Sequence, residues 1–346
     1  MMLNEMLNKP IKSTNISIFV PHLGCPHRCS FCDQKSISGQ QKAPSPEEAY
    51  ALLEEQAPHL AERGMTAQIA FFGGSFTAIP RGYMTELLIA AKAAMERFSV
   101  YTGMRCSTRP DCIDREILAL LKEYGMTAIE LGAQSMSDDV LRLNERGHTA
   151  DDVRRAARLI RENGFELGLQ MMTGLYGDTR EKSLYTADEF VKLQPKTVRI
   201  YPTVILKNTR LGELFASGVY RSFSFEETVE LCAELLGKFA ENDIRVIRMG
   251  LHASADVERE MLGGVYHPSF REIVESRILR DELFERLKAL PKGDYTVFTD
   301  GKNLSRLIGQ KRGNIVWFAQ RGYDVKVKEM TGKYLEIEDN ECFLKR

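Results

Sequence analysis

The chain has 346 residues, of which 43% are hydrophobic and 27% are charged, a balance typical of a folded protein with a sizeable core. Its formal net charge of -1 at pH 7 excludes a global field that would draw the whole protein to nucleic acid, so such attraction must be local. Apolar runs of about 18 residues are absent, which excludes a membrane-spanning helix, and residues 1–14 lack the apolar core of a secretory signal. We therefore expect a cytoplasmic protein without a membrane partner.

Short apolar or β-branched runs alternate with helical patterns through the first 205 residues. One helix start is well marked, because Ser45 supplies a capping side chain and Pro46 suits the first turn. Six βα units in series indicate a parallel sheet, since parallel strands need crossover connections, and right-handed crossovers can curl it. We predict an α/β fold with a partial (βα)6 barrel. Its strands are expected at 15–21, 66–72, 103–108, 127–131, 165–172 and 197–203, and its helices at 46–63, 81–98, 114–124, 137–144, 150–163 and 180–193.

The pattern becomes mostly helical after residue 205, most clearly over 225–241 and 269–290. Residues 290–294 have the composition of a linker. Beyond the linker, the order β, α, β, β predicts a small α+β module, with elements at 295–299, 304–320, 323–328 and 334–337. We therefore predict three domains, namely a core barrel, a helical extension of the core and a small C-terminal module, over residues 1–205, 206–290 and 291–346.

Three of the seven cysteines lie within eight residues, directly after the first predicted strand. Cys25, Cys29 and Cys32 form a C-x3-C-x2-C pattern. Thiolates are the usual ligands of iron–sulfur clusters, and three ligands would leave one iron with an open position for a substrate. A structural zinc site is the alternative, with His22 or His27 nearby as a further ligand. The odd number of cysteines argues against a disulfide framework.

Polar and glycine-rich segments lie at the ends of the next four predicted strands. Because ligands of α/β folds bind at the carboxyl ends of strands, these segments are expected to meet in one site. Two glycines after the second strand would let a ligand approach the backbone closely. The segments are 73–75, 107–111, 130–135 together with 146–149, and 170–177.

The cysteine spacing, its place after the first strand and the aromatic Phe31 resemble the radical SAM superfamily. The resemblance implies a 4Fe–4S cluster on Cys25, Cys29 and Cys32, with S-adenosylmethionine (SAM) as the second cofactor. In that family the SAM amine and carboxylate chelate the open iron, and one electron splits SAM to a 5′-deoxyadenosyl radical that removes a hydrogen atom from the substrate. It also implies a reducing partner such as flavodoxin or ferredoxin.

The same resemblance assigns SAM-binding residues. Gln134 and Gln170 match positions that contact the adenosine part of SAM. Arg146 matches the arginine that pairs with the methionine carboxylate, where a planar fork suits a bidentate contact. Ser107 stands where relatives often carry a glutamate, and it is included among the candidates. The glycine motif of the superfamily usually reads Gly-Gly-Glu or Gly-Gly-Thr, and here it reads Gly73, Gly74 and Ser75.

Residues 69 to about 220 are similar to the radical SAM core of the Elongator catalytic subunit, a family that modifies wobble uridines of transfer RNA at carbon 5. That family carries a large acetyltransferase domain after its core, and the roughly 55 residues after Pro291 are too few for it, so the acetyl-CoA step is not implied. A weaker resemblance, to oxygen-independent coproporphyrinogen dehydrogenases, points to a small molecule instead. The similar segments are 108–111, 130–135, 146–149, 171–172, 201–203 and 213–220.

Residues 304–315 resemble the helix–loop–helix of KH RNA-binding domains, in which a GXXG loop clamps the nucleic-acid backbone. Arg312 stands where the second glycine of that loop belongs, and Gly313 follows it. Basic residues outnumber acidic ones by eight to two between Lys302 and Lys333, and such clusters are typical of phosphate binding. A solvated basic face is the alternative. The RNA-binding candidates are Lys302, Arg306, Gly309, Lys311 and Arg312.

Together these features predict a radical SAM enzyme that modifies RNA, with transfer RNA as the expected partner and no DNA. The first alternative is radical chemistry on a small molecule such as a porphyrinogen. The second is a non-catalytic RNA-binding protein with a structural cluster. His148, His252 and His267 are candidate proton donors, and the sequence does not choose among them.

Overall fold

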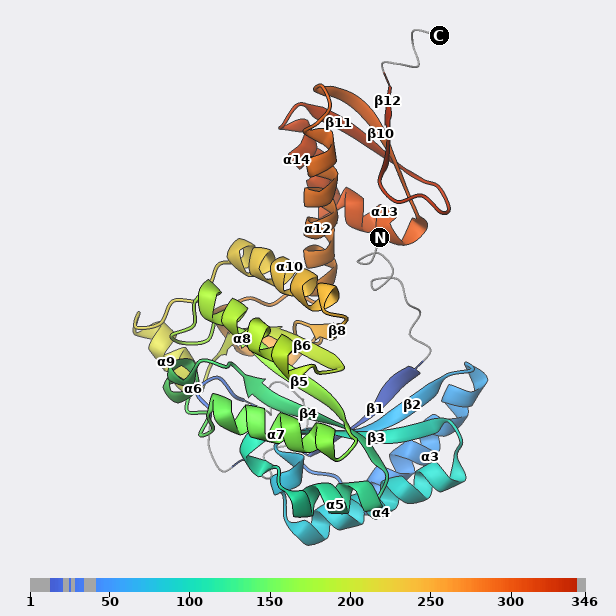
Figure 1. The fold of residues 1–346 in the computed structure, drawn as a ribbon, viewed down its shortest axis with the longest axis vertical. Coiled ribbons are helices and arrows are strands. Elements are labelled where there is room, and N and C mark those ends of the chain that lie inside the picture. Colours follow the sequence, from blue (N-terminus) through green and yellow to red (C-terminus); the bar gives the residue numbers. More distant parts are fainter. Residues whose placement is uncertain (1–12, 21–24, 26–28, 34–41, 341–346) are drawn as a thin grey trace. The chain divides into compact units, whose positions relative to one another are not determined.

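The computed structural model describes residues 13–20, 25, 29–33 and 42–340. Its largest feature is a seven-stranded sheet in the order β1-β2-β3-β4-β5-β6-β8, in which all neighbouring strands are parallel (Figure 1). The sheet is open, because β1 and β8 stand at its two edges and do not pair with each other. The predicted α/β fold with a partial barrel is therefore confirmed.

All six strands expected from the sequence are present, with ends shifted by a few residues. The structure adds a seventh, β8, inside the region expected to be a helical extension. A short antiparallel pair, β7 and β9, also lies in that region. The strands are β1 Ser13–Val20, β2 Thr66–Gly73, β3 Tyr101–Thr108, β4 Met126–Gln134, β5 Glu166–Thr173, β6 Thr197–Pro202, β7 Val204–Leu206, β8 Arg245–Met249 and β9 Met261–Gly264.

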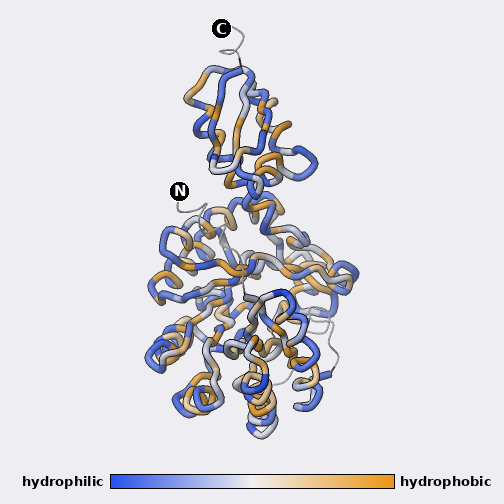
Figure 2. The backbone as a smooth tube through the Cα atoms, turned by 90° about the vertical axis from the view of Figure 1, so that its right-hand side faces the viewer, coloured by the Kyte–Doolittle hydropathy of each residue, from blue (hydrophilic) through white to orange (hydrophobic). Residues whose placement is uncertain are grey.

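The helices between the strands pack on one face of the sheet. In β5, for example, Leu167, Leu169 and Met171 are buried, while the alternating Gln170 and Met172 remain partly exposed on the other face. Hydrophobic and hydrophilic stretches accordingly alternate along the helices (Figure 2). The helices are α3 Pro46–Glu62, α4 Arg81–Arg97, α5 Arg115–Glu123, α6 Asp138–Leu143, α7 Ala150–Glu162, α8 Arg180–Leu193, α9 Arg210–Ala216, α10 Phe225–Glu241 and α11 Ala255–Glu260.

Local capping explains where two of these helices begin. The Ser45 side chain accepts a hydrogen bond from the Glu48 backbone, and the Glu48 side chain accepts one from the Ser45 backbone. Thr149 and Asp152 form the same reciprocal pair at the start of α7. Each pair satisfies two backbone N–H groups that a helix start leaves without partners.

The chain divides into two compact units. The first consists of the residues up to Ser224 with Lys238–Tyr266, and the second consists of Phe225–Gly237 with His267 onward. Residues of the predicted helical extension thus occur in both units, because β8 completes the large sheet while α12 (Phe270–Leu287) packs in the second unit. The predicted domain boundaries at 205/206 and 290/291 remain predictions.

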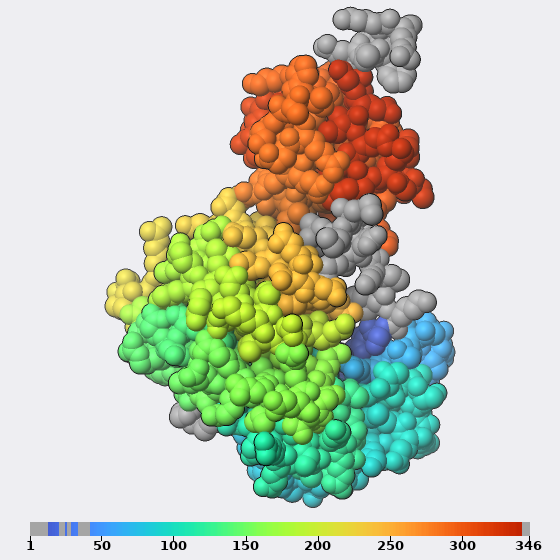
Figure 3. Space-filling model, in the orientation of Figure 1, coloured from blue at the N-terminus to red at the C-terminus, as the bar shows by residue number. Residues whose placement is uncertain are grey.

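The second unit is an α+β body with a three-stranded sheet in the order β11-β10-β12 (orange to red in Figure 3). β10 runs parallel to β11 and antiparallel to β12. One face of α12 joins its core through Leu279, Leu283 and Leu287. The region expected as one helix over 304–320 is broken at Gly309, which adopts a φ of 77°. The elements are β10 Gly293–Thr299, α13 Gly301–Ile308, α14 Gly313–Ala319, β11 Tyr323–Glu329 and β12 Glu336–Asp339.

No described helix has the length and apolar character needed to cross a bilayer.

Candidate active site at the carboxyl end of the sheet

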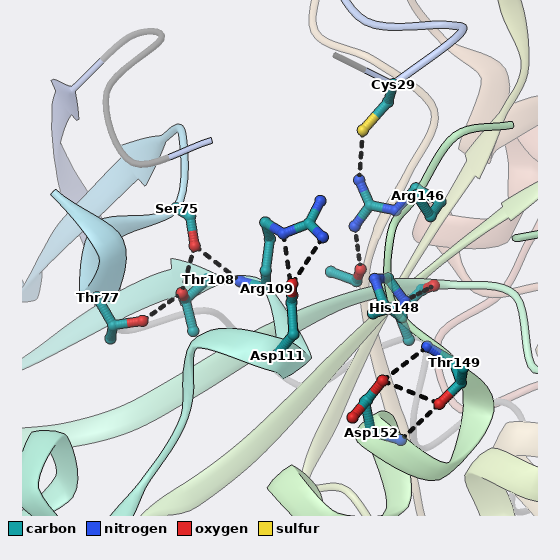
Figure 4. A network of polar contacts seen from close by, with 12 residues as sticks. Cys29, Ser75, Thr77, Thr108, Arg109, Asp111, Arg146, His148, Thr149 and Asp152 are labelled. Carbon is teal, nitrogen blue, oxygen red and sulfur yellow. Dashed lines mark hydrogen bonds and ion pairs between the residues drawn. The ribbon is translucent and has the colours of Figure 1, made fainter. Parts of the chain in front are cut away.

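The predicted site residues of the first unit gather where β1 to β5 end. The cysteine loop follows β1, and its Cys29 contacts Arg146, which follows β4 and α6 (Figure 4). The Gly73–Gly74 turn at the end of β2 lies against the backbone at the end of β1. Its Gly74 N–H donates to the Val20 carbonyl oxygen at 3.0 Å. Gly73 has a φ of 119°, and a Cβ there would lie 2.6 Å from that oxygen, so only glycine fits.

Arg146 ties the cysteine loop to the end of β4. Its Nη1 donates to Cys29 Sγ at 3.0 Å, and its Nη2 donates to the Gly132 carbonyl oxygen at 2.5 Å. The guanidinium carbon also lies 5.9 Å from the centre of the Phe31 ring. The side chain is buried, and its Nε has no hydrogen-bond partner in the described part of the chain. Contact between Arg146 and a SAM carboxylate remains a prediction. In the structure Arg146 holds Cys29.

A chain of hydroxyl groups links the ends of β2 and β3. Thr108 Oγ1 lies 2.8 Å from Ser75 Oγ and 2.6 Å from Thr77 Oγ1, and Ser75 Oγ also accepts from the Arg109 backbone N–H at 3.1 Å (Figure 4). Arg109 forms a bidentate ion pair with Asp111, with distances of 3.0 and 2.9 Å. Ser75 therefore fixes two strand ends to each other, a role that the sequence did not predict.

Two buried groups near Arg146 have unused hydrogen-bonding atoms. Gln134 adopts a φ of 66°, unusual for a residue with a Cβ, and its Oε1 has no partner among the described residues. His148 Nε2 lies 3.2 Å from the Ala133 carbonyl oxygen, and its Nδ1 likewise has no described partner. Burial, together with the nearby Arg146 and Arg109, lowers the pKa of His148 to about 3. The ring is therefore neutral near pH 7, with the proton on Nε2 and a free lone pair on Nδ1.

Ser107 and Gln170, both predicted to bind SAM, contact a carboxylate on the inner face of the sheet, which is the face opposite the helices. Gln170 Nε2 and Ser107 Oγ donate to Glu130 Oε1, the latter at 3.1 Å. Arg199 Nε donates to Glu130 Oε2 at 2.7 Å. Sequence reasoning gave Glu130 no role, although an acidic residue in the middle of an apolar strand was the signal that could have found it.

The cysteine residues have the chemistry of a cluster site. Cys25 is exposed, and Cys29 and Cys32 are partly buried. Burial and neighbouring thiols raise the pKa of both Cys25 and Cys32, whereas Arg146 lowers it. Burial and the neighbouring thiols raise the pKa of Cys32 to about 12. Within the described residues no group of three His, Cys, Asp or Glu side chains is close enough to hold a metal ion. Residues 26–28, which join Cys25 to Cys29, lie outside the described residues, as does the alternative zinc ligand His22.

The residues nevertheless fit a 4Fe–4S cluster and a polar ligand beside it. Three soft thiolate donors on one loop suit iron and sulfur. Buried polar groups normally have partners, yet four buried atoms at this edge lack them among the described residues. These atoms are Gln134 Oε1, Arg146 Nε, Arg109 Nη1 and His148 Nδ1.

The RNA-binding candidates of the second unit surround the break between α13 and α14. Lys311 and Arg312 are exposed, and both have positive φ values, of 50° and 62°. Lys302 is exposed on α13. Arg306 instead pairs with Glu275, with 2.9 Å between its Nη2 and Oε2 of the carboxylate. Gly309 admits no larger residue, because a Cβ there would lie 2.9 Å from Cγ of Asn314.

Comparison with known proteins gives the class. A model described as the radical SAM superfamily matches residues 19–190, and one described as the Radical_SAM C-terminal domain matches residues 195–280. The two matches cover well over half of the chain, and the chain belongs to the radical SAM superfamily. This superfamily uses a 4Fe–4S cluster and SAM, which confirms the predicted cofactors.

Several relatives share this core. Elongator complex protein 3 of Homo sapiens is 29% identical over 245 residues, which cover 65% of this chain and 44% of the relative. A tRNA uridine(34) acetyltransferase of Methanocaldococcus infernus is 25% identical over 273 residues, covering 64% of this chain and 50% of the relative. The solved structure of the archaeal Methanocaldococcus infernus Elp3 matches with a TM-score of 0.59 at 18% identity, covering 81% of this chain and 64% of that one. The chain thus spans about half the length of these curated relatives.

Proposed function

We propose that this radical SAM enzyme modifies RNA, and transfer RNA in particular. The observation that carries the proposal is the similarity of its core to two relatives, one named for the Elongator complex and one named for uridine 34 of transfer RNA. Both similarities run through about two thirds of the chain. The fold similarity to archaeal Elp3 agrees with this assignment.

Within this proposal the residues of the first unit hold and orient the cofactors. Cys25, Cys29 and Cys32 hold the cluster, which together with SAM supplies one-electron cleavage of SAM and hydrogen abstraction. Arg146 keeps Cys29 in place through the hydrogen bond to its sulfur. Gln134 Oε1 and His148 Nδ1 are buried acceptors without described partners, and they would accept hydrogen bonds from the amine or hydroxyl groups of SAM.

The second unit would hold the RNA backbone through a loop fixed in shape. Asn314 is buried, and its Nδ2 donates to the carbonyl oxygens of Arg306 and Leu307 at 3.2 and 3.1 Å and to Ser276 Oγ at 2.9 Å. These bonds anchor the loop at its base. Lys311 and Arg312 stay exposed at its tip, and neither forms an ion pair with a described residue. A preorganised loop that presents two cations is suited to phosphate contacts.

Nucleoside analysis of a deletion strain tests the proposal. Transfer RNA from wild-type and deletion strains is digested to nucleosides and compared by mass spectrometry. We expect one modified nucleoside to disappear, to return with the wild-type gene or with Cys232→Ser, and to stay absent with Cys32→Ala. Cys232 is a buried thiol of α10, remote in sequence from the cysteine triplet, and serves as the matched control. Identical nucleoside profiles in all strains would reject the RNA proposal and favour a small-molecule substrate.

A further inference from the structure

Ser30 stands between two of the three cysteines of the loop, and hydrogen bonds hold each of its polar groups. Its backbone N–H donates to the Asn144 carbonyl oxygen at 3.1 Å, and its Oγ donates to Asn144 Oδ1 at 2.8 Å. Its own carbonyl oxygen accepts from the Leu211 N–H at 2.7 Å. Asn144 ends α6 and Leu211 lies in the first turn of α9, two helices that Figure 1 draws next to each other. The buried Ser30 therefore joins the cysteine loop to two helix ends.

The amide of Asn144 has only one orientation that satisfies its partners. The side chain is fully buried, and its Nδ2 donates to the carbonyl oxygens of Val140 at 2.8 Å and of Tyr176 at 2.9 Å. Because carbonyl oxygens only accept hydrogen bonds, both require the NH2 group of the amide on their side. The amide oxygen must then face the Ser30 hydroxyl. The direction of this acceptor is thus set by α6 and by the turn after β5.

An aromatic ring and a tight turn hold the rest of this segment. The partly buried Phe31 ring packs against buried side chains from residues 205–220, the segment that also supplies the hydrogen bond to the Ser30 carbonyl oxygen. The Cys32 N–H donates to the Cys29 carbonyl oxygen at 3.1 Å and closes a turn around the two residues between them. Two of the three thiol groups therefore leave from one turn that both polar and apolar contacts hold in place.

Asn163 shows which of the Asn144 contacts are ordinary for a helix end. It ends α7 as Asn144 ends α6, and each residue donates from Nδ2 at 2.8 Å to the carbonyl oxygen four residues earlier. Each backbone N–H also donates to that same oxygen at 3.1 Å. Both residues therefore cap their helices in the same way. They differ in that Asn144 is buried and its amide oxygen reaches the cysteine loop, whereas Asn163 is partly exposed.

We propose that Asn144 is a positioning residue for the cluster, and that it acts through Ser30 to hold the turn from Cys29 to Cys32 in shape before iron and sulfide bind. Ordering a loop at the moment of binding weakens the binding, and a loop that is already ordered avoids this cost. The cluster should therefore be held more firmly with Asn144 than without it. The inference goes beyond the proposed function, because it concerns the cluster and holds whichever substrate the enzyme modifies.

Iron release from the reconstituted full-length protein tests the proposal. Without oxygen, an excess of a coloured iron(II) chelator removes the cluster, and the absorbance gives the rate. Asn144→Ala should release iron about tenfold faster than the wild type, because the buried Ser30 hydroxyl loses its acceptor. Ser30→Ala keeps both backbone hydrogen bonds and should lie between the two. Asn163→Ala, the matched control, should release iron at the wild-type rate. Wild-type rates in Asn144→Ala and Ser30→Ala, or an equal increase in Asn163→Ala, would overturn the proposal.

A double variant separates positioning from a general loss of stability. If Asn144 acts through Ser30, then Ser30→Ala should change the release rate little in a chain that already carries Asn144→Ala. Residues that act independently would instead give effects that multiply, and this result would contradict the proposal. Circular dichroism confirms that each variant is folded at the assay temperature. If Asn144→Ala does not fold, the comparison of Ser30→Ala with Asn163→Ala decides, and equal rates in these two variants would overturn the proposal.

Hydrogen exchange in the cluster-free protein tests whether the turn is formed in advance. The N–H groups of Ser30 and Leu211 are both donors in the contacts that anchor the loop. In the wild type without cluster we expect both to exchange at least about tenfold more slowly than amides of an unfolded segment. Asn144→Ala should remove this protection at Ser30, and Asn163→Ala should keep it. Unprotected exchange at Ser30 in the wild type would overturn the proposal, because the turn would then form only together with the cluster.

Discussion

Each of the two units contains one buried carboxylate between two arginines, and the two differ in completeness. Glu275 in the second unit is 2% exposed and pairs with Arg271 at 2.7 Å and with Arg306 at 2.9 Å. Glu130 in the first unit is 1% exposed and pairs closely with Arg199 alone, while Arg105 stays at 3.9 Å. In the second unit both arginines pair closely with the carboxylate, which we call a closed network. In the first unit only one of the two arginines does so, which we call an open network.

The two networks differ in how their arginines are solvated. Around Glu275 the arginines reach solvent, with side chains 34% and 21% exposed, so water completes their hydrogen bonds. Around Glu130 the two arginine side chains are only 7% and 10% exposed. Buried polar atoms that have no partner among the described residues also lie at the carboxyl end of the same sheet. Among the described residues, buried arginine atoms without partners therefore occur around Glu130 and not around Glu275.

The largest expected effect comes from the cysteine loop. Cys29→Ala should abolish both the cluster and SAM cleavage, because it removes one of three thiolates and the sulfur that Arg146 contacts. Anaerobically reconstituted protein should hold about four iron and four sulfide in the wild type and almost none in the variant. Cys112→Ala, which removes a thiol outside the triplet, should keep the cluster. Stoichiometric zinc without iron in the wild type would contradict the cluster assignment.

The next effect compares the two carboxylates directly. Glu130→Gln should lower the free energy of unfolding by about 3–5 kcal/mol, because it leaves buried arginine charge without its partner. Glu275→Gln should lower it by less, because the arginines around Glu275 reach solvent. Inorganic phosphate at constant ionic strength should restore stability to Glu130→Gln but not to Glu275→Gln, since among the described residues only the first network has buried arginine atoms without partners. Thermal unfolding with and without phosphate measures this. Equal stabilisation of both variants would remove the distinction between the two networks.

A smaller effect is expected at the exposed loop of the second unit. Lys311→Ala with Arg312→Ala should weaken transfer RNA binding and flatten its salt dependence by about 1.5–2 slope units, roughly one for each phosphate that is no longer neutralised. Arg286→Ala with Lys288→Ala is the control, because both cations are already paired with glutamates on α12. Titrations at several salt concentrations give the slopes. A slope equal to that of the wild type would reject the loop as an RNA contact.

The sequence predicted what local patterns encode. The strands of the large sheet alternate or run apolar, and the cysteine triplet has a spacing that few other sites share. β8 was missed because its five residues, Arg245–Met249, place two arginines among apolar residues and complete the sheet only through pairing with β6. Contacts between residues far apart in the sequence could not be predicted either. Arg146 and Cys29 are 117 positions apart, and no local pattern shows that one holds the other.

The roles of Ser75 and Gln170 show the same limit. Ser75 follows the second expected strand and Gln170 lies near the end of the fifth, but their partners are set by the register of neighbouring strands. Ser75 contacts Thr108, and Gln170 contacts Glu130 across the sheet. The ends of the strands could therefore be predicted from the sequence. The structure was needed to show which polar side chains at those ends contact other residues of the fold.

The last prediction concerns His148, a buried neutral ring beside the Ala133 carbonyl oxygen in the first unit. Its pKa is about 3 in the folded chain, below the ordinary value of 6.5, so the unfolded chain binds the extra proton first as the pH falls. The free energy of unfolding should therefore decrease by roughly 1.4 kcal/mol per pH unit between about pH 6 and pH 4, beyond the change seen in His148→Gln. Urea unfolding across this range gives the difference. Parallel pH profiles would show that the folded chain protonates His148 as readily as the unfolded chain does, which would contradict the lowered pKa.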